Sequence, residues 1–210
     1  MKNVLLINKP SGITSYDVIR ILKKKLHPKK IGHAGTLDPL ASGLLIVLID
    51  GATKQSEKFM ALEKRYRVEM HLGIKTDTGD VDGKITQKSA LPELNKKKIE
   101  KTLKKFEGKI KQTPPIYSAI KYKGKKLYEY ARAGIKVKIK PRFVEIKKIK
   151  LLGFNRETIE LRVDCSKGTY IRTLVEDIAK KLKTVAVTSR LVRERIGNYT
   201  LIKAIKLEDL

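Results

Sequence analysis

The sequence is poor in the residues that form disulfides and metal sites, and it lacks long apolar runs. Its one cysteine, Cys165, excludes an intrachain disulfide. It has no tryptophan, and its three histidines, His27, His33 and His71, show no metal-ligand spacing. No stretch approaches the roughly 20 uninterrupted apolar residues of a membrane helix, and the N-terminus lacks the order of a signal peptide. We therefore expect no metal and no membrane span, and a cytoplasmic location.

Acidic residues are also scarce. The 210 residues include 48 Lys and Arg against 22 Asp and Glu, which gives a formal net charge of +26. Solubility does not require so large an excess of one sign, and a polyanionic partner is its simplest physical reason. An anionic membrane surface is the alternative, but the missing apolar span favours nucleic acid. A hydrophobic content of 41% in a chain of this length is enough for one core, so we expect a single domain.

Apolar residues follow strand and helix periods in turn. The run LLIVLI at 44–49 is typical of a central strand covered on both faces. Residues 64–72 alternate between apolar and polar, and Tyr66 lies on the apolar side. Helical spacing recurs at Ile99, Leu103 and Phe106 and again over 171–182, while further strands are expected at about 142–154, 157–165 and 186–195. These elements predict an α+β or mixed α/β domain around one sheet.

The segment after the first strand predicts a capped amphipathic helix. Either Thr14 or Ser15 supplies the capping oxygen, and His27-Pro28 ends the helix. The apolar residues expected to share its buried face are Val18, Ile21, Leu22 and Leu26.

Residues 121–142 combine basic and aromatic side chains. Lysines and arginines are frequent there, three tyrosines lie among them, and Gly124 and Gly134 interrupt the pattern. We interpret this segment as a projecting hairpin and short helix that form a basic nucleic-acid-binding arm.

Asp38 lies in the glycine-rich stretch GHAGTLDP, residues 32–39. An aspartate followed by proline is a common helix N-cap, so a structural role is the simpler interpretation of these residues alone. The glycines at 32, 35 and 43 favour a second interpretation, because they let backbone approach a ligand closely. Both interpretations stay open at this point.

Six blocks, taken together, are similar in order and spacing to the bacterial TruB family of tRNA pseudouridine-55 synthases. They span nearly the whole chain and read KPSGITSYDVI, GHAGTLDPLASGLL, KRYRVEMHLGIKTDTGDVDG, PPIYSAIKYKGKKLYEYARAG, CSKGTYIRTLVEDIA and SRLVRERIG. The resemblance implies a mixed, mostly antiparallel central sheet with flanking helices. It also implies an isomerase that converts uridine 55 in the T-loop of tRNA into pseudouridine after flipping the base out of its stack.

The same resemblance implies that Asp38 is the catalytic nucleophile. Breaking and remaking a glycosidic bond needs a group that can attack and then leave, and a carboxylate suits this role without a cofactor. Because burial raises the pKa of a carboxyl group, an ionised nucleophile needs a cation beside it. The resemblance places Arg172 in that position; on the residues alone, Arg172 could equally be a surface arginine of a helix.

Four further residues match the family's substrate contacts. Tyr66 matches a tyrosine that stacks on the base, and Tyr170 one that contacts the base and helps to remove the C5 proton. Leu191 matches a leucine that lines the pocket, and His33 a wedge against the flipped region of the RNA. From the residues alone, Tyr66 and Leu191 could be ordinary core and His33 a solvated loop residue.

The expected partner is the T-arm of tRNA, with no cofactor, no protein partner and a monomeric state. Family members commonly continue into a C-terminal RNA-binding domain, whereas this sequence stops at KAIKLEDL, so we expect a short form spanning 1–210. Two rivals remain open: a non-catalytic RNA-binding protein, and a related synthase that acts on ribosomal or guide-selected uridines. Lys9 could touch a phosphate or a sugar, although a solvated side chain is the simpler interpretation. Asp77, Asp80 and Asp82 are interpreted as turn residues rather than a calcium loop.

Overall fold

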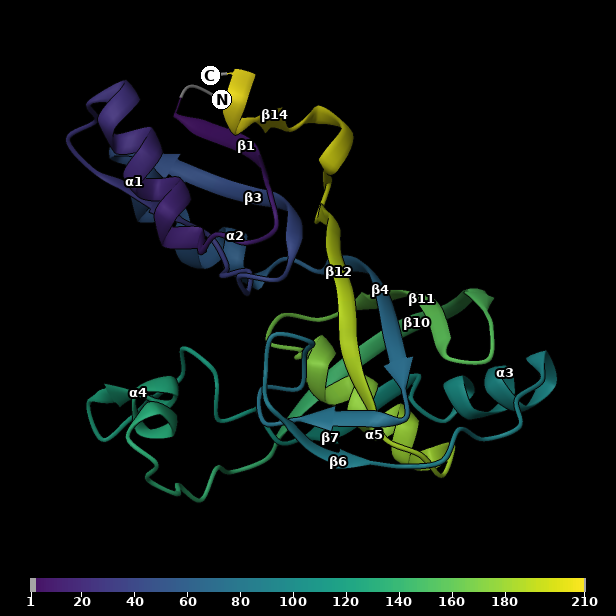
Figure 1. Cartoon of the computed structure of the whole chain (residues 1–210). Coiled ribbons are helices and arrows are strands. Elements are labelled where there is room, and N and C mark those ends of the chain that lie inside the picture. Colours follow the sequence, from purple (N-terminus) through teal and green to yellow (C-terminus); the bar gives the residue numbers. More distant parts are fainter. Residues whose placement is uncertain (1–2, 210) are drawn as a thin grey trace. The chain divides into compact units, whose positions relative to one another are not determined.

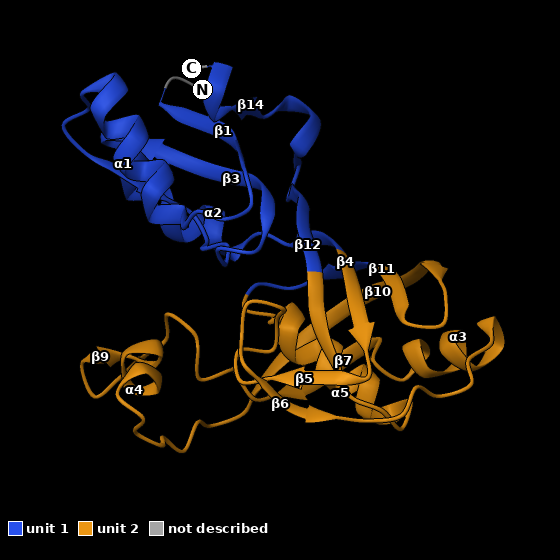
Figure 2. Cartoon of the chain, viewed as in Figure 1, with its two compact units in different colours: residues 1–67, 162–167, 190–210 blue, residues 68–161, 168–189 orange. Residues whose placement is uncertain are grey.

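The computed structural model describes residues 3–209 (Figure 1). The chain forms two compact units, shown in Figure 2. Unit 1 comprises residues 1–67, 162–167 and 190–210, and unit 2 comprises 68–161 and 168–189. Three strands contribute residues to both units, namely β4 (Lys64–Leu72), β11 (Thr158–Cys165) and β12 (Ala186–Ile196).

The strands of unit 1 surround β3 (Ser42–Ile49). β1 (Val4–Lys9) and β2 (Ile31–His33) both pair with β3 in antiparallel fashion, and β12 pairs with it in parallel. Outer pairings are made by β14 (Ile205–Lys206), parallel to β1, and by β13 (Tyr199–Thr200), antiparallel to β12. The apolar run at 44–49 is thus an inner strand, as its sequence predicted.

Both faces of β3 are covered. On one face, Leu45 and Val47 pack with the buried residues of α1 (Ser15–Leu26). On the other, alternate residues of β3 pack with Ala52 and Phe59, from the short helices η1 (Asp50–Gln55) and α2 (Ser56–Ala61). An unbroken apolar run is required here because neither face meets water.

α1 begins at the predicted cap. Thr14 accepts a hydrogen bond from the Asp17 amide at 3.0 Å, and Asp17 accepts one from the Thr14 amide at 2.8 Å, which completes a capping box. The predicted buried face was partly wrong: Ile19 is buried, whereas Ile21 and Leu26 are exposed. The core stripe of α1 therefore follows positions 15, 18, 19 and 22, the i, i+3, i+4, i+7 pattern.

Unit 2 is built on β10 (Arg142–Phe154), which pairs in antiparallel fashion with β7 (Gly108–Gln112). Over the chain, the hydrogen-bonded strand order is β14-β1-β3-β12-β4-β11-β10-β7. A second, two-stranded sheet joins β5 (Ile74–Thr76) to β6 (Ile85–Lys88). This is an α+β fold with a mixed, mostly antiparallel sheet and flanking helices, as expected.

The helices of unit 2 bury the predicted stripes. α3 (Lys96–Lys104) buries Ile99 and Leu103, and α5 (Ile171–Lys181) buries Leu174, Val175 and Ile178 among others. The basic segment forms a hairpin of β8 (Lys121–Tyr122) and β9 (Lys125–Lys126), followed by α4 (Leu127–Arg132). The secondary structure expected for 121–142 is therefore present. Within residues 3–209, no helix has the length and apolar character needed to cross a bilayer.

Gly43 provides a test of how closely β3 and β12 approach. Its φ is +104°, and a Cβ at this position would lie 2.5 Å from the Arg193 carbonyl oxygen and 2.8 Å from the Arg193 nitrogen. We expect Gly43→Ala to lower the free energy of unfolding by at least about 2 kcal/mol, measured by urea denaturation. Gly51→Ala is the matched control, because a Cβ there meets nothing within 4 Å and φ is unstrained. Equal stability of the two variants would contradict this close approach of the two strands.

Candidate active site

Asp38 lies in the loop that joins β2 to β3, and other parts of unit 1 hold this loop by its backbone. Ser15 donates to the Leu37 carbonyl at 3.1 Å and accepts from the Leu37 amide at 2.8 Å. The Gly12 amide donates to the Pro39 carbonyl at 2.9 Å. The residues on either side of Asp38 are therefore both fixed, and the half-buried Asp38 lies between two anchored peptides.

Arg193 on β12 holds the same loop from another direction. Its side chain is 1% exposed, and its nitrogens donate to the carbonyls of Leu44 at 2.8 Å, Gly35 at 3.0 Å and Thr36 at 3.3 Å. Sequence reasoning missed Arg193. The available signal was the strand alternation in SRLVRERI, which puts it on the same side as the buried Leu191.

Lys9 is a third anchor of this loop. It is fully buried, and its ammonium donates to the carbonyls of Ile13 at 2.6 Å, Pro10 at 2.8 Å and Pro39 at 3.3 Å. Burial lowers the pKa of Lys9 to about 8, and the negative charge of Asp38 partly opposes this shift. The interpretation of Lys9 as a solvated or phosphate-contacting side chain was therefore wrong, because backbone oxygens surround its charge.

Tyr66 is influenced by the same charges. Burial raises the pKa of its phenol, the positive charge of Arg193 opposes the rise, and Cys165 and Asp38 add to it. Leu191 is 6% exposed on β12, and half-buried His33 ends β2, opposite Val47. Unit 1 thus contains four of the predicted site residues, and the negative charge of Asp38 is a small contribution to the raised pKa of Tyr66.

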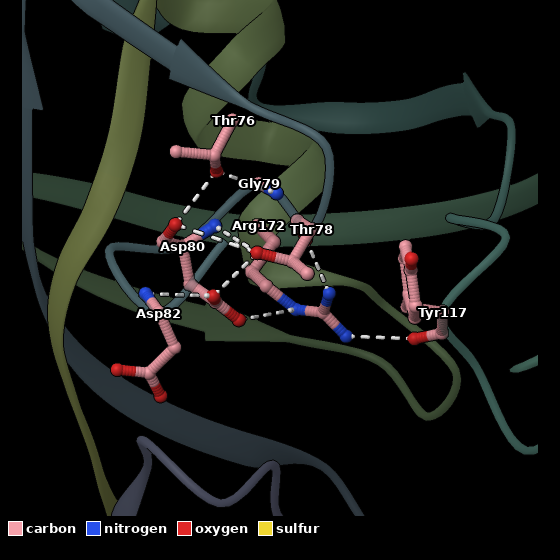
Figure 3. Close-up of polar contacts among 7 residues, drawn as sticks. All are labelled: Thr76, Thr78, Gly79, Asp80, Asp82, Tyr117 and Arg172. Carbon is pink, nitrogen blue, oxygen red and sulfur yellow. Dashed lines mark hydrogen bonds and ion pairs between the residues drawn. The ribbon is translucent and has the colours of Figure 1, made fainter. Parts of the chain in front are cut away.

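In unit 2, Arg172 is buried rather than exposed on its helix. Figure 3 shows its guanidinium beside the turn that follows β5. Its nitrogens donate to the carbonyls of Thr78 at 2.5 Å and Tyr117 at 2.9 Å, and its Nε lies 3.9 Å from Asp80. Thr76 and Thr78 in turn donate to oxygens of Asp80 at 2.6 Å. The turn that contains Asp80 thus has a structural role, and it orients Arg172.

Tyr170 immediately precedes α5 and is held by its backbone. Gln112, which is 1% exposed, accepts from the Tyr170 amide at 2.8 Å and donates to the Tyr170 carbonyl at 3.0 Å. The Arg142 guanidinium lies 5.0 Å from the centre of the Tyr170 ring, within the range of a cation–π contact. Gln112 and Arg142 are two positioning groups that the sequence did not reveal.

The six predicted site residues fall into two groups. His33, Asp38, Tyr66 and Leu191 belong to unit 1, and Tyr170 and Arg172 belong to unit 2. The expected pairing of Asp38 with Arg172 joins residues of different units and stays a prediction. Among residues 3–209, no group of three or more His, Cys, Asp and Glu side chains is arranged to hold a metal ion.

Known proteins are similar to this sequence over most of its length. A family model described as the N-terminal domain of TruB family pseudouridylate synthases matches residues 23–171. tRNA pseudouridine synthase B of Endomicrobium trichonymphae is 47% identical over 98% of this chain and 90% of that protein. tRNA pseudouridine synthase B of Mesoplasma florum is 45% identical over 98% of this chain and 72% of that protein.

Solved structures share the fold over almost the whole chain. A chain in a Cbf5–Nop10–Gar1 complex is 31% identical with a TM-score of 0.78, and the match covers 99% of this chain and 53% of that one. A chain in an H/ACA ribonucleoprotein bound to a substrate RNA containing 2′-deoxyuridine is 29% identical with a TM-score of 0.73, covering 99% and 52%. The present chain therefore spans about half the length of these solved relatives.

The buried ammonium of Lys64 makes the free energy of unfolding depend on pH. It is 7% exposed, donates to the carbonyls of Leu62 at 2.5 Å and Met60 at 2.6 Å, and has its pKa lowered by burial to about 8 from 10.5. Between these values the unfolded chain binds more protons than the folded chain, so the contribution of Lys64 to the free energy of unfolding rises with pH. The rise amounts to at most about 3 kcal/mol.

We therefore expect Lys64→Met to remove part of the increase in the free energy of unfolding between pH 8 and pH 10, measured by urea denaturation. Exposed Lys58→Met is the control and should keep the wild-type pH dependence. Parallel pH profiles for wild type and Lys64→Met would contradict the assigned burial of the amine.

Proposed function

The chain belongs to the TruB family of pseudouridylate synthases, and from this premise we propose that it isomerises uridine 55 in the T-loop of tRNA with Asp38 as its nucleophile. The observation that carries the proposal is the anchoring of the Asp38 loop. Arg193 and Lys9, both buried, donate their hydrogen bonds to the carbonyls of this loop and its neighbours. A loop held by its backbone in this way leaves the carboxylate oriented for chemistry.

The names of the curated relatives support transfer RNA as the substrate. The curated relatives at 45 and 47% identity are named tRNA pseudouridine synthase B, whereas the chains from the Cbf5–Nop10–Gar1 complex and the H/ACA ribonucleoprotein are 31 and 29% identical. The formal charge of +26 suits any RNA and does not separate the two substrates. The proposal of tRNA over a guide-selected uridine rests on this difference in similarity.

The chemistry requires no oxidant, metal or external energy. The bond between N1 and C1′ breaks, the uracil rotates, and C5 bonds to C1′. C5 then loses its proton, and N1 ends with one, so atoms and electrons balance. Asp38 could attack the sugar or the base, or remove a sugar proton, and it is regenerated in each case. All three routes need the carboxylate to be held beside the glycosidic bond, between the ribose and the base.

The other site residues are proposed to hold the flipped nucleotide. Base flipping exposes a uracil that must be stacked and shielded from water, which suits the ring of Tyr66 and the apolar side chain of Leu191. Tyr170 would contact the base and assist removal of the C5 proton. Arg172 would pair with Asp38, and His33 would occupy the gap left in the RNA.

The 121–142 arm is proposed to clasp the T-arm. Its Tyr128 ring lies 5.5 Å from the Lys126 ammonium and 5.4 Å from the Arg132 guanidinium, so cations already surround an aromatic face. Such a surface suits phosphates and unstacked bases together. We further propose that the chain acts as a monomer without a protein partner, in the cytoplasm where tRNA is found.

The test is tritium release from a T-arm RNA labelled at C5 of its uridines. We expect wild type to release tritium and Asp38→Asn to lose at least about 10³-fold in rate while its Kd for the RNA stays within about threefold, because only the reacting group changes. Glu57→Gln, an exposed carboxylate on α2, is the matched control and should retain full activity.

Three outcomes would contradict the proposal. Equal tritium release by wild type and Asp38→Asn would remove Asp38 from the chemistry. Tight binding without release by wild type would leave a non-catalytic RNA-binding protein. Release from ribosomal fragments but not from T-arms would contradict tRNA as the substrate.

A further inference from the structure

Unit 1 contains a cavity of about 400 Å³ lined by three lysines and two hydroxyls. The lysines are Lys23, Lys29 and Lys30, and the hydroxyls belong to Thr53 and Ser56. None of the predicted site residues lines it. Among the described residues that do line it, none is acidic.

The local backbone brings these lysines together. α1 ends at His27, whose φ of +49° is left-handed, and its amide donates to the Lys23 carbonyl at 3.1 Å. Pro28 then cannot continue the helix, and the chain bends at Lys29 and Lys30, immediately before β2. Lys23, in the last turn of α1, and Lys29 and Lys30, just before β2, therefore line one cavity although they are six and seven positions apart.

Lys30 is fixed by its backbone. Its amide donates to the Asp50 carboxylate at 2.9 Å, and the Asp50 amide donates to the Lys30 carbonyl at 2.8 Å. These two hydrogen bonds use only the backbone of Lys30, which is one of the residues that line the cavity. The Asp50 carboxylate accepts a backbone hydrogen bond there and does not line the cavity.

A site of this composition suits a phosphate group. Three ammonium groups supply charge and donors, the Ser56 hydroxyl can supply a further donor, and no carboxylate among the described lining residues repels an anion. The Thr53 hydroxyl donates to the Asp50 carbonyl at 2.6 Å and is not counted among these donors. A neutral ligand would gain little from such a lining. The chemical class indicated is therefore a phosphate ester.

We propose that this cavity binds a backbone phosphate of the RNA substrate outside the target nucleotide. The cavity is lined by Ile31 and Gly32 of β2, and the next residue of that strand is His33, the proposed contact to the flipped region. A phosphate in the cavity and a nucleotide against His33 would then both lie along β2. This inference rests on the proposed function, because the RNA is the substrate named there.

The test compares two triple variants with the same loss of charge. The cavity variant is Lys23→Gln, Lys29→Gln and Lys30→Gln; the control is Lys24→Gln, Lys58→Gln and Lys203→Gln, all exposed lysines of unit 1 outside the cavity. The Kd for T-arm RNA is measured across a range of KCl concentrations around the physiological one. Far-ultraviolet circular dichroism and urea denaturation establish that both are folded.

We expect the cavity variant to bind roughly tenfold more weakly than the control at physiological salt, with a slope of log K against log salt shallower by about 0.7 or more, the value for one lost phosphate. The rate of tritium release at saturating RNA should stay at the wild-type value in both variants. Equal Kd values and slopes for the two variants would overturn the proposal.

The remaining arms identify the source of the phosphate. Pyrophosphate is tested for protection of wild type and of the cavity variant against thermal unfolding. If it protects only wild type, and the cavity and control variants have equal slopes of log K for RNA against log salt, the cavity binds a small phosphate ligand. That result would overturn the RNA assignment. Wild type that binds RNA through the cavity without releasing tritium would overturn the proposed function and leave the phosphate site standing.

Discussion

The three hydrogen bonds from Arg193 to the carbonyls of Gly35, Thr36 and Leu44 constrain the rest of unit 1. A buried guanidinium is costly unless its donors are satisfied, and here backbone oxygens satisfy them. The requirement is mutual, because the same carbonyls would be buried without these partners if the arginine were lost. Gly43 is a second constraint at the same residue, because a Cβ there would meet the Arg193 backbone and only glycine lets β3 and β12 approach so closely.

This arrangement also explains why buried cations and a carboxylate can occupy one region. Lys9 and Lys64 both feel the positive charge of Arg193, and each directs its ammonium at main-chain oxygens. Lys9, which the negative charge of Asp38 reaches, and Arg193 hold the backbone of the Asp38 loop, whereas Lys64 holds the backbone at Met60 and Leu62. Most of the formal charge of +26 lies on the surface, whereas these three buried charges donate to main-chain oxygens of unit 1.

Much of the fold follows from periodicity, because it depends on which residues are apolar. The buried strand β3, the alternating strand β4, the helix α5 and the hairpin at 121–126 all lie where the pattern put them. The buried face of α1 was shifted because Ile21 is apolar but points away from the core.

The site was less predictable from residues alone. Asp38, Tyr66 and Arg172 were named through resemblance to a family, and the pattern alone would have allowed a cap, a core ring and a surface arginine. The roles of Arg193 and Lys9 were missed because their partners are backbone carbonyls, which leave no trace in the sequence, and because Leu44 is 149 positions from Arg193. Long-range polar contacts to the main chain can be found only once the chain is folded.

The most direct test of this dependence on Arg193 is the single-turnover rate of pseudouridine formation by Arg193→Lys, with Arg190→Lys, an exposed arginine of the same strand, as its control. A lysine keeps the charge but cannot form the planar set of donors that reaches three carbonyls. If the loop depends on those donors, the rate of Arg193→Lys falls at least about 100-fold with its Kd for RNA nearly unchanged, because a small displacement of a reacting group has that effect. A folded Arg193→Lys with the full rate would contradict it.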